Sequence, residues 1–126
     1  MPVPWITASM TVKGDLGKWS KKAIKRFQKD EMPTLAKIAG TVLGKAKKNA
    51  PVITGALRAS GRMERGGPTS WLIMFGGGGT GVNYAAAVEY GSATRSPKPY
   101  LRPAVMSVLP HAKKEIERMV QRSLRG

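Results

Sequence analysis

The hydrophobic pattern of the chain changes its period near Gly14, and this change restricts the fold to one that combines a sheet with helices. Over residues 4–12 apolar and polar side chains alternate, which is typical of a half-buried strand. After a turn with Asp15 as a candidate N-cap, the apolar residues follow a helical stripe to about residue 49. We therefore expect an early strand followed by a long helix.

One proline lies inside this helical segment. Pro33 lacks the amide hydrogen that a helix interior uses, so we expect the helix of about residues 15–49 to be kinked or broken near it. Asn49-Ala50-Pro51 ends the helix, because the residue before a proline disfavours the helical conformation.

Two further strands are expected in the second half of the chain. Residues 56–65 and 70–76 flank a Gly-Gly-Pro turn. The apolar run of residues 71–75 should form the centre of the sheet, because it is rich in residues that favour strands.

The remaining segments predict helices. Residues 82–91 should contain a short helical turn stopped by a glycine, and the last helix should begin near Arg102-Pro103 and bend at Pro110. The predicted fold class is α+β: a small antiparallel sheet packed against the long N-terminal helix and the C-terminal helix, in a single domain over residues 1–126.

The chain is strongly basic. Its 126 residues include 22 Lys and Arg against 7 Asp and Glu, a formal net charge of +15. Such a charge on one compact domain repels itself unless it lies against an anionic surface, so DNA or an acidic protein is the expected partner. No apolar run approaches the roughly 18–20 residues that span a bilayer, and we expect no membrane partner.

No set of residues resembles a catalytic or metal site. The chain has no Cys and one His, His111, which excludes thiolate sites and clusters of His ligands. Acid–base catalysis needs a pair of carboxylates that converge from separate elements. Neither the pair Asp30-Glu31 nor the pair Glu115 and Glu117 has this arrangement. We expect no enzymatic activity, no metal and no cofactor.

Glu89 stands in an apolar, Ala-rich segment. A carboxylate that is even partly buried there needs a partner. Arg102 and Arg58 are the candidates for a structural ion pair. In the alternative interpretation, Glu89 is a solvated residue on a short helix.

Three short stretches carry a further signal. They are Ala50-Pro51 with Thr54–Ser60, Tyr84-Ala85 with Val88–Gly91, and Pro97–Ala104. In this order and at these distances they closely resemble the neck and tail-completion proteins of long-tailed bacteriophages, a family of tail components. The likeness covers about residues 12–124, because the two long helices also fit it.

The resemblance implies a structural virion protein at the head–tail interface, assembled in the host bacterial cytoplasm. It implies a ring of copies, a hexamer in preference to a dodecamer. The ring would join the head connector or stopper to the tail-terminator or tail-tube proteins. The basic charge would face acidic neighbouring rings or DNA in the channel.

In such a ring, two loops of about residues 76–81 and 92–100 are expected to be flexible and to reach neighbouring subunits, because loops can become ordered on assembly. Prolines stiffen the second loop, and Tyr and Arg are frequent at interface hot spots. The expected interface residues are Gly77, Gly78, Gly79, Arg95, Lys98, Tyr100 and Arg102.

A basic nucleic-acid-binding protein of another class is the alternative. The net charge and a row of lysines on the first helix favour it: Lys18, Lys22, Lys25 and Lys29. Most aromatic residues, however, fall at predicted core positions, where they cannot stack on bases. A membrane-surface peptide would explain only the basic amphipathic helix and not the sheet-forming half.

Overall fold

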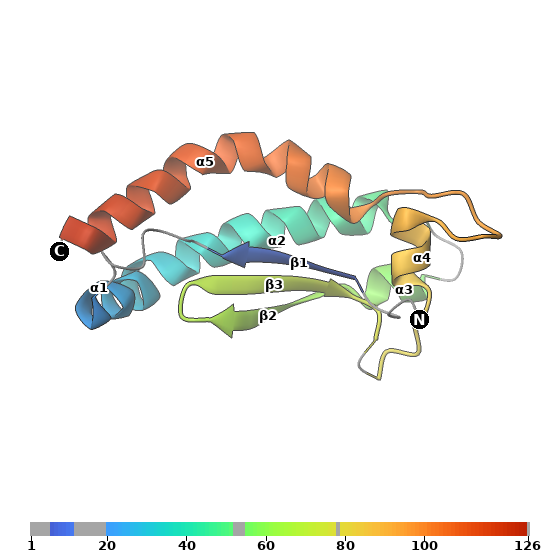
Figure 1. The fold of residues 1–126 in the computed structure, drawn as a ribbon, viewed down its shortest axis with the longest axis horizontal. Coiled ribbons are helices and arrows are strands. Elements are labelled where there is room, and N and C mark those ends of the chain that lie inside the picture. Colours follow the sequence, from blue (N-terminus) through green and yellow to red (C-terminus); the bar gives the residue numbers. More distant parts are fainter. Residues whose placement is uncertain (1–5, 12–19, 52–54, 78, 126) are drawn as a thin grey trace.

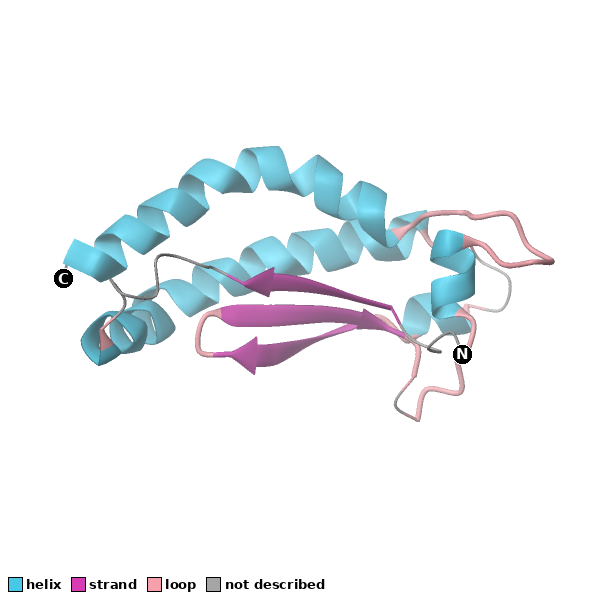
Figure 2. Ribbon diagram, in the orientation of Figure 1, coloured by secondary structure: helices cyan, strands magenta, loops and turns pink. Residues whose placement is uncertain are grey.

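The computed structural model of the chain describes residues 6–11, 20–51, 55–77 and 79–125, with the backbone alone for residues 6–11. A three-stranded antiparallel sheet forms one layer, and the long helices form the other (Figures 1 and 2). This arrangement is the α+β fold predicted from the sequence.

The sheet has the strand order β1-β3-β2. Strand β1 is Ile6–Thr11 and pairs with the central strand β3, Ser70–Phe75, so that Ile6 lies opposite Phe75. Strand β2, Arg62–Gly67, pairs with the other edge of β3, with a shift of register between Arg65 and Gly67. The predicted central strand is confirmed. The expected early strand is confirmed over residues 6–11, and residues 4, 5 and 12 lie outside the described residues.

The expected strand over residues 56–65 is wrong in its first half. Ala56–Ala59 forms a helical turn, α3, which follows Gly55 in the left-handed conformation (φ 80°). All four of its residues are good helix formers, and its Leu57 is buried in the core. The extended strand therefore starts only at Arg62, where β2 begins.

The N-terminal helical segment contains the irregularity that was expected near Pro33. Helix α1, Lys21–Arg26, starts at the N-cap Ser20, whose hydroxyl accepts the amide of Ala23 at 3.1 Å. A π-helical segment, η2 (Phe27–Glu31), then joins α1 to helix α2, Met32–Asn49. Figure 1 shows α1 turned away from the direction of α2.

Pro33 lies in the first turn of α2, where its missing amide is tolerated. The amide of Met32 donates to the carbonyl of Phe27, five residues back, so the π-helical segment absorbs the irregularity. The expected helix start at Asp15 lies outside the described residues.

Helix α5, Leu101–Arg125, packs along α2. Its ribbon is arched and contains Pro110, which removes one helical hydrogen bond. The buried residues of both helices recur every three or four positions and meet in the core: Leu35, Ala39, Val42 and Ala46 on α2, and Leu101, Ala104, Val108 and Ala112 on α5.

An ion pair fastens the far end of α5 to η2. The Arg122 guanidinium donates to both carboxylate oxygens of Glu31, from Nε at 2.8 Å and from Nη2 at 2.9 Å. Arg26 donates two further hydrogen bonds to the carbonyl of Ser123. Hydrogen bonds to Glu31 and then Glu115 raise the pKa of Arg122. Glu31 and Glu115, considered above as potential catalytic acids, therefore have a structural partner.

Candidate interaction surface

The end of the molecule opposite the C-terminus gathers the residues expected at an interface. We call it the α4 end: α3, helix α4 (Ala85–Tyr90), the described part of residues 76–81, and the loop of residues 92–99. Figure 1 shows these segments together on the right of the molecule.

A buried carboxylate organises this end. Glu89 is 0% exposed, and its carboxylate accepts the backbone amides of Tyr100 at 3.1 Å, Leu101 at 2.7 Å and Arg102 at 3.3 Å. These amides begin α5 and have no partner within that helix. Glu89 therefore caps α5 from a different helix and fixes the ends of the loop between them.

Of the two candidate partners, the structure brings Arg102 to Glu89. Arg102 Nε lies 3.0 Å from Glu89 Oε2, and Nη2 donates to the Glu89 carbonyl at 3.1 Å. The guanidinium also lies 4.9 Å from the ring centre of Tyr90, a cation–π distance. Arg58 instead donates to the carbonyl of Ala50 at 3.4 Å. The solvated interpretation of Glu89 is wrong.

Tyr100 is a correction to the expected interface. Its ring is 0% exposed, packs edge-on against Phe75 with 5.0 Å between ring centres, and donates its hydroxyl to the Ala85 carbonyl at 3.0 Å. Burial, followed by the charges of Glu89 and Tyr90, raises the pKa of the phenol. An aromatic residue beside an Arg resembles an interface hot spot in sequence, but this one belongs to the core.

The loop of residues 92–99 is exposed yet tied to the body. Ser92 and Arg95 exchange backbone hydrogen bonds at 2.9 and 3.3 Å, and the Lys98 amide donates to the Val88 carbonyl at 2.8 Å. The side chains of Arg95 and Lys98 are exposed, as expected of interface residues. Together with Pro51 and Val88 they line a hollow of about 120 Å³.

The glycine loop is a hydrogen-bonded turn. Gly77 donates to the Val82 carbonyl at 2.9 Å, and the Thr80 hydroxyl donates to the Gly77 carbonyl at 2.7 Å. Gly77 and Gly79 have positive φ, which explains the need for glycine there. Gly78 lies outside the described residues.

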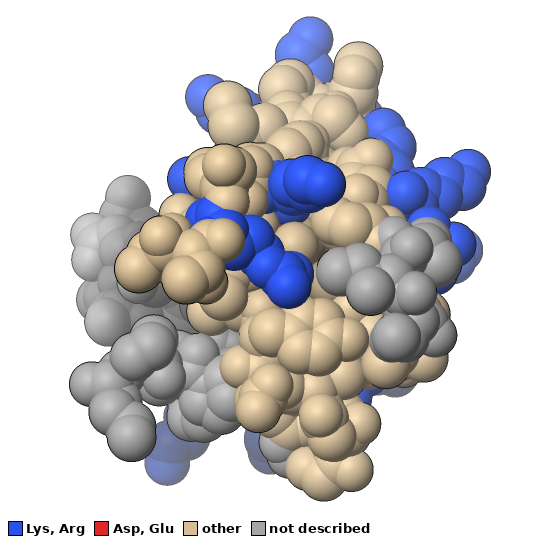
Figure 3. Space-filling view, turned by 90° about the vertical axis from the view of Figure 1, so that its right-hand side faces the viewer, with Lys and Arg blue, Asp and Glu red and all other residues tan. Residues whose placement is uncertain are grey.

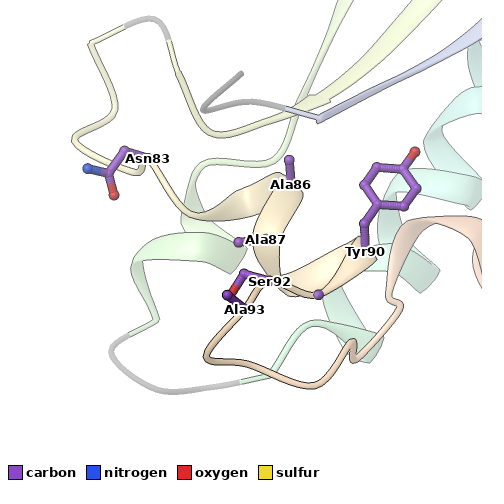
Figure 4. A pocket seen from close by; sticks show the side chains of 7 residues that line it. Asn83, Ala86, Ala87, Tyr90, Ser92 and Ala93 are labelled. Carbon is purple, nitrogen blue, oxygen red and sulfur yellow. The ribbon is translucent and has the colours of Figure 1, made fainter. Parts of the chain in front are cut away.

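A second, larger hollow of about 370 Å³ lies on the other side of α4. Figure 4 shows side chains that line it: the methyl groups of Ala86 and Ala87 and the ring of Tyr90 along α4, with Ser92 and Ala93 of the loop next to Ala87. The sequence did not predict this hollow, because a run of alanines indicates a helix packed in the core and not the wall of a surface hollow. The full lining is Asn83, Ala86, Ala87, Tyr90, Gly91, Ser92 and Ala93.

The described surface of this end is basic. Figure 3 faces it and shows Lys and Arg side chains with no Asp or Glu in view. Arg58, Arg95 and Lys98 are exposed here, and none of them pairs with an acid of the described residues.

Residues 12–91 match the family described as "Bacteriophage HK97-gp10, putative tail-component". The chain belongs to this family. The match covers more than half of the chain and includes Glu89 and the glycine loop, whereas Arg102 and the loop of residues 92–99 lie beyond it. The resemblance noted in the sequence is thus confirmed as a family of phage tail components.

No curated protein and no solved structure matches this HK97-gp10 family member. Within the described ranges, no helix is long and apolar enough to cross a membrane. The same part of the chain holds no group of three or more acidic or His side chains that could bind a metal ion.

Proposed function

We propose that this chain is a structural virion protein of a tailed bacteriophage that forms a ring at the head–tail interface, as a neck or tail-completion protein. The family match over residues 12–91 carries the proposal. Its description names a tail component, and the position between head and tail is the finer part of the proposal.

An exposed apolar stripe supports a role in assembly. Among the described residues, the large apolar side chains that stay exposed are Tyr90 (59%), Met106 (74%) and Leu109 (48%). Arg102, which stacks on Tyr90, precedes Met106 by four positions and Leu109 by seven, so these residues share one face of α5. An apolar stripe with an Arg at its end is the composition that protein interfaces favour.

A closed ring needs two different surfaces on each copy, because its contacts are head-to-tail. The stripe Tyr90–Arg102–Met106–Leu109 supplies one of them in this proposal. We propose six copies in preference to twelve, contacting the head connector or stopper on one side and a tail-terminator or tail-tube protein on the other. The protein acts by binding, without an enzymatic reaction, a cofactor or a membrane.

Removing the chain from its phage tests the proposal. With the gene deleted, infected cells should accumulate filled heads and separate tails, seen by negative-stain electron microscopy of lysates. The wild-type chain supplied from a plasmid should restore joined particles. Joined, infectious particles without the chain would contradict the proposal.

A nucleic-acid-binding protein is the second candidate, because a row of lysines is exposed and has no acidic partner in the described residues: Lys21, Lys22, Lys25 and Lys29. A gel shift with duplex DNA under rising salt separates the two candidates. Binding that several phosphates drive weakens steeply as salt rises. A specific, tight complex at physiological salt would favour this second candidate.

A further inference from the structure

The loop of residues 92–99 contributes side chains to two hollows of different chemistry. On one side, Ala86, Ala87 and the Tyr90 ring line an apolar hollow of about 370 Å³. On the other, Arg95 and Lys98 line a hollow of about 120 Å³ with Pro51. Both hollows are built on α4, so their relative position is fixed by the same short helix.

The basic hollow has an excess of positive charge that the described part of the chain does not neutralise. Arg58 adds a third cation, because its guanidinium donates to the carbonyl of Ala50, the neighbour of Pro51. Glu89, the acid of this end, is fully buried and bound to Arg102 and three amides.

The other described acids lie elsewhere in the fold. Glu64 is on β2 and pairs with Arg62, and the rest lie on η2 and the second half of α5: Asp30, Glu31, Glu115 and Glu117. Within the described ranges no acid pairs with Arg58, Arg95 or Lys98, so these three cations are available to complementary charge on another molecule.

The shape of the site favours a protein partner over a nucleic acid. Grooves for single-stranded nucleic acid combine an extended basic track with several stacking aromatic rings. Here the cations are clustered at one end, and the apolar hollow contains one aromatic ring and three alanine methyl groups. Such a hollow accommodates an aliphatic or aromatic side chain, while the cations beside it suit carboxylates.

We propose that the α4 end is a two-part docking site for an acidic segment of a neighbouring protein. One apolar side chain of that segment enters the hollow beside Ala87, and carboxylates next to it pair with Arg58, Arg95 and Lys98. The inference rests on the proposed function, in which the neighbour is the adjoining ring of the head–tail junction.

Fluorescence anisotropy on the purified full chain tests the site with synthetic peptides. The probe is a labelled peptide with one Leu flanked on each side by two Glu. Replacing its Glu by Gln, or its Leu by Gly, should weaken binding by about tenfold or more, because each half of the site loses its ligand.

Variants of the chain locate the contact. The double variant Arg95→Glu and Lys98→Glu should bind the peptide that contains Glu and Leu about tenfold or more weakly than the wild-type chain does. Lys113→Glu with Lys114→Glu is the matched control, since it makes the same change of charge at exposed positions of α5 and should weaken binding by less than about threefold. Ala93 is exposed and lines the apolar hollow, so Ala93→Leu should fill part of it. This variant should bind the peptide with Leu more weakly than the wild-type chain does, and the peptide with Gly equally well.

Thermal melts of each variant show that it is folded. Equal losses for the two charge-reversal pairs would overturn the proposal, because binding would then follow net charge alone. The proposal would also be overturned if a labelled single-stranded oligonucleotide bound tightly, lost binding in the Arg95 and Lys98 variant, and the peptide did not bind. The head–tail role is tested separately, by electron microscopy of particles made without the chain, so the two proposals can fail independently.

Discussion

The carboxylate of Glu89 lies 3.0 Å from Nε of Arg102 and at the same time accepts the three backbone amides that begin α5. A helix N-terminus favours negative charge, so the acid gains from the helix as well as from the guanidinium. Glu89 is fully buried, whereas the Arg102 side chain is 53% exposed. The two partners therefore contribute unequally to stability.

Glu89→Ala should be the more damaging of the two truncations. It leaves two buried amides and one part-buried amide without an acceptor, and we expect a loss of about 3–5 kcal/mol of unfolding free energy. Arg102→Ala keeps those hydrogen bonds and removes a half-exposed cation, so a loss of about 1–2 kcal/mol is expected. Urea denaturation measures both. Equal losses would contradict the capping role of Glu89.

Gly91→Ala should distort the attachment of the loop of residues 92–99. Gly91 has a φ of 83°, and an added Cβ would lie 2.9 Å from Cδ of Pro97 and 3.2 Å from the carbonyl oxygen of Arg95. Gly55→Ala is the matched control, because it has a φ of 80° but no described atom within 4 Å. We expect a loss of about 1 kcal/mol for the control and about 2–4 kcal/mol for Gly91→Ala. Similar values for both would mean that the packing of Pro97 against Gly91 is loose.

Stability should fall at alkaline pH partly through Tyr100. Its phenol has a raised pKa in the folded protein, so above about pH 10 the unfolded chain ionises there while the folded chain does not. Stability is therefore lost as the pH rises, by up to about 1.4 kcal/mol per pH unit. Tyr100→Phe should be less stable than the wild type by about 1 kcal/mol at pH 8, because Ala85 loses a hydrogen bond.

At pH 11 this difference should shrink or reverse, because the variant has no phenol to ionise. Unfolding free energies of the two proteins at both pH values test the prediction, and the effects of lysine titration cancel in the comparison. A constant difference would show that Tyr100 does not respond to pH in this range.

Met106→Asp should impair assembly without unfolding the chain. Met106 is 74% exposed, so we expect a change in unfolding free energy within about 0.5 kcal/mol. In plasmid complementation of the deleted phage, this variant should yield fewer infectious particles than the wild type. Gln121→Asp, at another exposed position of α5, is the control and should complement fully. Full complementation by both variants would contradict the claim that the apolar stripe is a contact surface in assembly.

The sequence predicted those elements whose hydrophobic period is long and uniform. Strand β3 and helices α2 and α5 follow from repeats of apolar residues, and these set the two layers. Helix α3 was missed because four residues are too few to show a helical period, and the burial of Leu57 depends on the tertiary fold.

The candidate site was only partly predictable for a related reason. The pairing of Glu89 with an Arg followed from a carboxylate in an apolar segment, but the choice of Arg102 over Arg58 depended on how α5 returns to α4. The pair of Glu31 and Arg122 joins residues far apart in the sequence, with no local pattern to indicate it. The apolar hollow depends on the space beside α4, which residue types alone do not define.

Cryo-electron microscopy of the intact virion tests the central claim most directly. We predict a closed ring at the head–tail junction whose subunits fit the three-stranded sheet and the α2–α5 pair. The absence of the chain from that junction, or its presence only at the distal end of the tail, would contradict the proposed function.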